Sequence, residues 1–173
     1  KTVLYSPTFR KDEDVRVKEL IESFRDKDIN LIVIVHFLTK LDLDIFEYKN
    51  VIRFEDHLIE ALICSDYLIT DYSALCFEAA VMGKPMFFYA YDLDKYIKER
   101  GFYIDYKKEM PGLISNDPNE ISSAIQNDEY DIETVRKFRD KYVKIQQDNT
   151  REIIKLIEWF LDEIRVYGNY TRL

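Results

Sequence analysis

Short apolar runs alternate with longer stretches of helical periodicity along most of this 173-residue chain. Five of the runs have the length of strands, and they fall at residues 2–5, 31–35, 51–54, 67–70 and 86–89. Between them the spacing of apolar residues predicts helices, at residues 14–24, 56 or 57 to 64, and 73–82. The run at 31–35 is apolar at every position, which is typical of a parallel sheet covered by helices on both faces. The alternation predicts an α/β fold, a doubly wound parallel sheet.

The last third of the chain is expected to be helical. Helices are predicted at residues 119–127, 132–146 and 150–166, and residues 107–118 are expected to form the only long irregular stretch. A domain holds about 150 residues, so the chain is predicted to form one domain over 1–173, with 119–173 as its helical C-terminal part.

Composition excludes several classes of protein. The chain has 25 Lys and Arg against 33 Asp and Glu, a net charge of −8, which argues against binding nucleic acid. No apolar run approaches the ~20 residues of a membrane-spanning helix. Two cysteines make no disulfide framework, so a reducing cytoplasm is expected. Neither a cluster with metal-ligand spacing nor a dinucleotide or P-loop motif occurs, and no metal or cofactor is predicted.

Polar residues follow several of the predicted strands. In a parallel α/β sheet, ligands bind beyond the carboxyl ends of the strands, where here Ser6–Arg10, His36, Asp71–Ala74 and Ala90–Asp92 are expected to converge. A helix that opens near Ser73 would present free N–H groups suited to phosphate. The alternative is that the Ser73 hydroxyl only caps that helix.

Glu78 follows Ser73 by five residues on the same predicted helix. A carboxylate there either complements the helix dipole or accepts both hydroxyls of a ribose. The segment from Glu78 to Pro85, Glu-Ala-x-x-x-Gly-x-Pro, resembles the nucleotide-sugar half of GT-B glycosyltransferases, in which that Glu holds the ribose.

A longer ordered series of motifs resembles the C-terminal half of the CDP-glycerol glycerophosphotransferases, which prime or polymerise wall teichoic acid. The resemblance implies a Rossmann-like, GT-B-type half that holds CDP-glycerol, as a fragment of a longer enzyme whose N-terminal half meets the acceptor. The series comprises Leu4–Arg10, Asp66–Ser73, Lys84–Tyr89, Tyr91-Asp92, Tyr96, Arg100–Asp105 and Pro111-Gly112.

The resemblance also implies roles for single residues. His36 takes the place of the family's phosphate-binding histidine and is the predicted catalytic residue, although Phe37 follows it where the family usually has Pro. Ser73-Ala74 stands for a Ser-Ser pair and keeps both backbone N–H groups. Glu78 is longer than the usual Asp. The predicted donor-binding set is Thr8, Arg10, His36, Asp71, Ser73, Ala74, Glu78 and Arg100.

Alternatives stay open for the two arginines of that set. Arg10 either pairs with a phosphate or forms a salt bridge to Asp12 or Glu13. Arg100 either clamps a phosphate or anchors its own loop.

The expected function is transfer of glycerol phosphate from CDP-glycerol to a lipid-linked wall polymer, at the inner face of the bacterial membrane. The chain alone is expected to bind the donor without turning it over, because the acceptor half is missing. The alternatives are a GT-B glycosyltransferase for capsular or surface polysaccharide and a non-catalytic nucleotide-binding domain. The basic residues within 136–144 either touch anionic lipid or form a solvated helix face.

Overall fold

The computed structural model describes residues 1–10, 16–36, 48–54, 56–144 and 148–168 of the chain. It divides into two compact units, residues 1–143 and residues 144–173. The first unit contains the whole sheet and the helices around it. The second contains one helix, α8 (Asn149–Gly168).

The first unit is built on a six-stranded sheet in which every paired strand is parallel to its neighbour. The strand order is β3-β2-β1-β4-β5-β6, so the direction of winding reverses between β1 and β4. The predicted doubly wound parallel sheet is therefore confirmed. The strands are β1 (Thr2–Tyr5), β2 (Asn30–Val33), β3 (Val51–Arg53), β4 (Tyr67–Thr70), β5 (Met86–Tyr89) and β6 (Ile114–Ser115).

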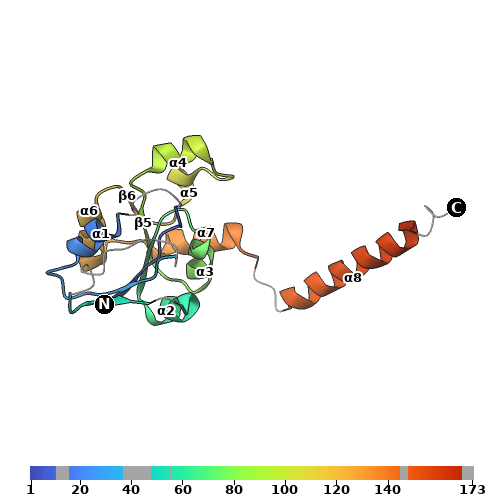
Figure 1. Cartoon of the computed structure of the whole chain (residues 1–173), viewed down its shortest axis with the longest axis horizontal. Helices are drawn as coiled ribbons and strands as arrows, with labels where there is room; N and C mark the ends of the chain where they lie inside the picture. Colours follow the sequence, from blue (N-terminus) through green and yellow to red (C-terminus); the bar gives the residue numbers. More distant parts are fainter. Residues whose placement is uncertain (11–15, 37–47, 55, 145–147, 169–173) are drawn as a thin grey trace. The chain divides into compact units, whose positions relative to one another are not determined.

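Helices cover both faces of the sheet, with α1 and α6 together on one side and α3 and α7 on the other (Figure 1). Side chains of β1 alternate between the two cores, since Val3 and Tyr5 pack with α1 and α6 while Leu4 packs with α2, α3 and α7. The helices of this unit are α1 (Val17–Ser23), α2 (Leu58–Cys64), α3 (Leu75–Val81), α4 (Leu93–Glu99), α5 (Tyr106–Glu109), α6 (Pro118–Gln126) and α7 (Ile132–Tyr142).

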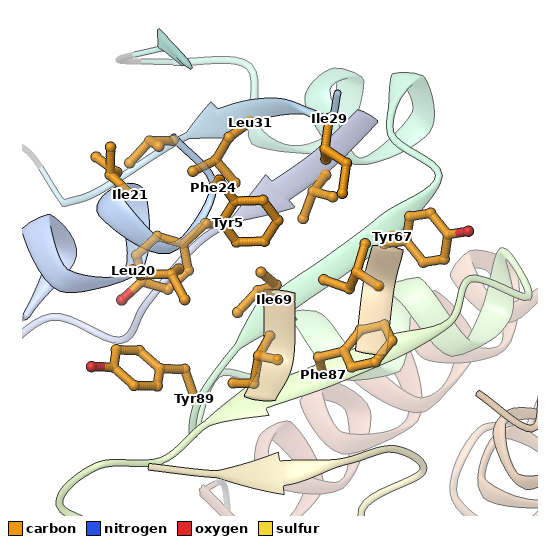
Figure 2. Close-up of a cluster of buried hydrophobic side chains, with 14 of the residues drawn as sticks. Tyr5, Leu20, Ile21, Phe24, Ile29, Leu31, Tyr67, Ile69, Phe87 and Tyr89 are labelled. Atoms are coloured by element: carbon orange, nitrogen blue, oxygen red, sulfur yellow. The ribbon is translucent and has the colours of Figure 1, made fainter. Parts of the chain in front are cut away.

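The core on the α1 side is rich in aromatic residues. Figure 2 shows Leu20, Ile21 and Phe24 facing the strand residues Tyr5 and Ile69, with Phe87 and Tyr89 further along the sheet. Burial of a side chain of this size contributes about 1.5–3 kcal/mol. The apolar runs that predict the strands are thus the same residues that hold the two helical layers to the sheet.

The prediction of one irregular stretch over 107–118 is wrong, because this stretch contains most of α5 and the short sixth strand β6. β6 has only two residues and so lacks the apolar run of a strand. It pairs with β5 through Phe88 N, which donates to Leu113 O at 2.8 Å. Helix α4 follows β5 directly and was not predicted, because Leu93 is its one buried residue.

Some predicted helix ends also differ from the structure. The helix expected from Ser73 begins at Leu75 and ends at Val81, and the helix expected to reach residue 146 ends at Tyr142. The backbone of Val143 is extended, so α7 does not continue.

The basic residues of α7 lie among carboxylates. Arg136 pairs with Glu133, Arg139 with Asp140, and Lys141 donates to both carboxylate oxygens of Glu109 at 2.7 and 2.8 Å. These contacts fit the alternative of a solvated helix face.

Among the helices of the described residues, none has the length and apolar character needed to cross a membrane. The second unit's helix α8 does expose large apolar side chains, including Ile153, Ile157, Trp159, Phe160 and Ile164.

Candidate functional site

A cavity of about 690 Å³ lies at the carboxyl edge of the sheet, where the winding reverses. Ligand sites in proteins typically have volumes of about 300–1,000 Å³, and in this fold they form at the reversal point. The cavity is lined by the loops after β1, β2 and β4 (residues 6–9, 34–36 and 72–74) and by Asp56 and Leu58 at the start of α2.

His36 lies at this cavity, three residues beyond the end of β2. Its side chain is exposed, and its ring packs on Phe9 with a centroid distance of 4.4 Å and an interplanar angle of 33°. Phe9 follows β1, the strand paired with β2, so the sheet itself brings the two rings together. Phe37 lies outside the described residues.

Ser73 and Ala74 line the same cavity as His36. The Ser73 hydroxyl accepts a hydrogen bond of 3.2 Å from Leu75 N, the first residue of α3. This contact lies at the start of α3, whose N-cap residue is Ala74 rather than the expected Ser73. A phosphate role for these two residues stays a prediction, and their position beside His36 is compatible with it.

Asp71 lies behind the cavity wall rather than in it. It is 2% exposed, and its Oδ1 accepts from Thr8 N at 2.8 Å and from Thr8 Oγ1 at 2.6 Å. Thr8 lines the cavity. The Asp71 carboxylate therefore supports the loop after β1 from within.

Arg10 is also buried behind the cavity, at 8% exposure. Its guanidinium forms salt bridges to Asp71 at 2.7 Å and to Asp92 at 2.8 Å, and it packs over the ring of Tyr72 at 5.2 Å. The alternative salt bridge to Asp12 or Glu13 involves residues outside the described part of the chain. A role for Arg10 in contacting phosphate stays untested, but its guanidinium here binds two aspartates of the protein.

Electrostatics in this network favour the charged forms of Arg10 and Asp92 and the neutral form of the Tyr72 phenol. Burial alone would lower the pKa of Arg10, but the hydrogen bond to Asp92 and the charge of Asp71 outweigh it and raise that pKa. Burial raises the pKa of Asp92, but hydrogen bonds from Arg10 and Tyr72 outweigh it and lower that pKa. Burial and the bond to Asp92 raise the pKa of the Tyr72 phenol.

Besides Arg10 and Asp71, two further predicted donor-binding residues do not line the cavity. Glu78 is exposed in the first turn of α3, and Arg100 is exposed at the end of α4 with its guanidinium 5.8 Å from the ring of Tyr96. The contact with Tyr96 fits the alternative in which Arg100 anchors its own loop. The structure thus gathers Thr8, His36, Ser73 and Ala74 at one cavity.

The predicted donor-binding set leaves out several residues that line the cavity, among them Phe9, Asp56 and Tyr72. Phe9 and Tyr72 lie within segments that the strand-end rule selected, and the same rule applied to the third strand would have reached Asp56. His57, next to Asp56, has a left-handed backbone with φ 65°, a conformation that few residues other than glycine adopt.

A second cavity of about 660 Å³ lies where β5 and β6 end. Among the residues that line it are Asp92, Lys95, Lys107, Asn116 and Glu120. Lys107 donates to Asp94 at 3.1 Å within this cavity wall. Among the described residues, no group of three or more His, Cys, Asp or Glu side chains could hold a metal ion.

The sequence of this chain is similar to those of teichoic acid transferases. A family profile described as CDP-Glycerol:Poly(glycerophosphate) glycerophosphotransferase matches residues 1–158. The teichoic acid glycerol-phosphate transferase of Staphylococcus aureus (strain NCTC 8325 / PS 47) is 36% identical over 172 residues, which cover 89% of this chain and 44% of that protein. The chain spans less than half the length of the curated relatives it matches.

Solved structures of other proteins share this α/β fold. The wall teichoic acid polymerase TagF aligns with a TM-score of 0.71 and 30% identity over 94% of this chain and 44% of that one, and a TagF variant was also solved after a soak with CDP-glycerol. The calicheamicin glycosyltransferase CalG4 aligns with a TM-score of 0.61 over 80% of this chain and 37% of its own, at 15% identity, and supports the fold alone. The expectation of a GT-B-type half is confirmed.

Proposed function

Since the chain belongs to the CDP-glycerol:poly(glycerophosphate) glycerophosphotransferase family, we propose that it is the donor-binding half of such a transferase. The donor, CDP-glycerol, binds in the cavity lined by His36 and Ser73. The observation that supports this most is that both residues, one after β2 and one after β4, border a single cavity at the reversal point of the sheet. TagF, soaked with CDP-glycerol, gives independent support for the class of donor.

The reaction that follows from this donor is a phosphoryl transfer. A hydroxyl of the acceptor attacks the β-phosphate of CDP-glycerol, the bond between the two phosphates breaks, and CMP leaves with the bridging oxygen. The attacking hydroxyl loses its proton to a base, which we assign to the other half of the enzyme. Positioning and charge stabilisation contribute most of the catalysis in such transfers.

His36 and the amides at the start of α3 then act on the pyrophosphate. We propose that His36 hydrogen-bonds an oxygen of the diphosphate and offsets charge as CMP leaves, while the N–H groups near Ser73 and Ala74 orient the same group. Glu78 lies outside the cavity, so in this proposal the ribose extends beyond it and its hydroxyls donate hydrogen bonds to the Glu78 carboxylate. The lipid-linked acceptor enters through the other half, and the enzyme works at the cytoplasmic face of the membrane.

His36→Ala is expected to weaken binding of CDP-glycerol to the chain by about 10- to 100-fold. The substitution removes a hydrogen bond to a charged group, and such a bond contributes about 1.5–3 kcal/mol. Titration calorimetry with CDP-glycerol measures the change directly.

His57→Ala is the matched control, because His57 is exposed just before α2, pairs with Glu60 and does not line the cavity. It should bind CDP-glycerol as the native chain does. Titrations of the native chain with UDP-sugars test the glycosyltransferase alternative. Tighter binding of a UDP-sugar than of CDP-glycerol would contradict the proposed donor.

Glu78→Gln is expected to remove the preference of the chain for CMP over its 2′-deoxy analogue. The carboxylate can accept bonds from both ribose hydroxyls, and the neutral amide accepts them more weakly. Calorimetric comparison of the two nucleotides in both chains gives the preference. If the native chain and the variant discriminate equally, Glu78 does not contact the ribose.

A further inference from the structure

The guanidinium of Arg10 ties together the loops that follow three different strands. Its Nη1 donates to Asp71 Oδ2 at 2.7 Å and to Thr8 O at 2.8 Å, and its Nε and Nη2 donate to the two oxygens of Asp92 at 2.8 and 3.0 Å. Arg10 follows β1, Asp71 follows β4 and Asp92 follows β5. One side chain therefore bridges the point where the sheet reverses its winding.

Asp71, which Arg10 holds, in turn restrains Thr8. Its Oδ1 accepts from both the backbone N and the Oγ1 of Thr8, so the residue is held at main chain and side chain together. A threonine hydroxyl has a single proton to donate. Because that proton is directed at Asp71, the hydroxyl can only accept a hydrogen bond from a molecule in the cavity, which makes it a poor ligand for phosphate oxygens.

Phe9 lies between two anchored residues. Thr8 is held by Asp71, and Arg10 is held by both aspartates and by its packing over Tyr72 and Tyr91 at 5.2 Å each. The Phe9 ring then packs on the imidazole of His36 at 4.4 Å. The imidazole is exposed at the cavity, and this ring contact is one restraint on its orientation there.

We infer that Arg10 is a positioning residue of the donor cavity: with Asp71 it fixes Thr8 and Phe9, and Phe9 holds the His36 ring in place. The effect on donor binding rests on the function proposed above, whereas the effect on the His36 ring does not. A site whose loops are already fixed loses less conformational freedom when its ligand binds. The buried pair Arg10 and Asp71, together with the half-buried Asp92, thus holds the wall of a cavity that none of the three lines.

Arg10→Lys in the full 173-residue chain tests the positioning. Lysine keeps the positive charge but lacks the planar fork that reaches both aspartates and the Thr8 carbonyl at once. The chain has only two histidines, so ¹H–¹³C spectra of the imidazole rings, assigned with His57→Gln, report His36 directly. We expect the His36 ring signals, which feel the nearby Phe9 ring, to move toward those of a free histidine.

The His57 signals provide an internal reference, because His57 lies just before α2, beside Glu60. They should stay in place. Arg136→Lys, an exposed arginine of α7 paired with Glu133, is the matched control and should leave both histidines unchanged. In the Arg10→Lys chain, CDP-glycerol affinity should also fall about tenfold, the loss expected when one or two side chains become mobile.

A second variant covers the case in which Arg10→Lys does not fold. Thr8→Val keeps the shape of the side chain and removes only the 2.6 Å bond to Asp71, so it should move the His36 signals in the same direction by a smaller amount. Unchanged His36 signals in a folded Arg10→Lys chain, or in Thr8→Val when Arg10→Lys is unfolded, would overturn the inference. Signals that move while the native chain fails to bind CDP-glycerol would support the positioning and reject the proposed donor.

Discussion

Replacing Arg10 with methionine is expected to lower the free energy of unfolding of the chain by about 3–5 kcal/mol. Methionine retains much of the apolar packing against Tyr72 and Tyr91 but leaves the carboxylates of Asp71 and Asp92 without their cation. Asp71 is 2% exposed, so water cannot take the place of the guanidinium. Urea unfolding at pH 7, followed by circular dichroism, measures the change.

The control is the same substitution at an exposed arginine. Arg136→Met breaks a surface pair with Glu133 and is expected to change the free energy of unfolding by at most about 0.5 kcal/mol. Equal losses in Arg10→Met and Arg136→Met would show that the buried network contributes no more than a surface pair.

Acidification provides a second measurement on the same pair of chains. In the native chain the pKa of Asp92 is lowered, so its contribution to stability is complete above the ordinary value of about 4 and is lost as the pH falls below it. In Arg10→Met the half-buried carboxylate of Asp92 lacks its cation, so it favours protonation and its pKa rises. The destabilisation in the variant should therefore shrink as the pH falls from 7 toward 5. If the difference in free energy of unfolding between the native chain and Arg10→Met stayed constant from pH 7 to pH 5, this explanation of the destabilisation would be contradicted.

Gly112→Ala is expected to lower the free energy of unfolding by about 3 kcal/mol. A Cβ at this position would lie 1.9 Å from the carbonyl oxygen and 2.9 Å from the carbonyl carbon of Met86 in β5. These atoms belong to the backbone of a strand paired on both sides, so they cannot rotate away as a side chain would. The variant must move β6 away from β5, and the Phe88 amide, which donates to Leu113 O, should exchange with solvent faster.

Gly83→Ala is the matched control for this glycine. Gly83 has a left-handed φ of 67°, and nothing lies within 4 Å of its Cβ position, so only backbone strain of about 1–2 kcal/mol is expected. Denaturant unfolding and amide exchange of Phe88 distinguish the two. Gly83→Ala should leave exchange at Phe88 unchanged, and a Gly112→Ala chain that loses less than Gly83→Ala would contradict the close approach.

The parts of the fold that depend on apolar runs could be predicted from the sequence. Residues 2–5, 31–35 and 67–70 are apolar enough to identify β1, β2 and β4, and the rule for strand ends then led to Thr8, His36 and Ser73. β6 could not be found this way, because its pairing depends on the absence of a side chain at Gly112 more than on its own two residues.

The network behind the cavity could not be predicted from sequence patterns. Arg10 meets aspartates that are 61 and 82 residues away, while two acidic residues within three positions offered a nearer interpretation. Glu78 and Arg100 were proposed from the resemblance to the family. A sequence motif identifies the type of residue but does not show how far that residue lies from a cavity. The strand-end rule differs, because it selects residues by their position after a parallel strand. Such residues lie at the same edge of the sheet.

The strand order also bears on how the chain is assembled during synthesis. β1 is made first, yet its neighbours are β2 and β4, and Thr70 Oγ1 at the end of β4 donates to Ser6 O, 64 residues earlier. The centre of the sheet therefore stays open on one side until β4 has left the ribosome. Strand pairings between residues this distant in sequence slow folding. Until β4 pairs with it, the apolar edge of β1 is exposed and prone to non-native contacts.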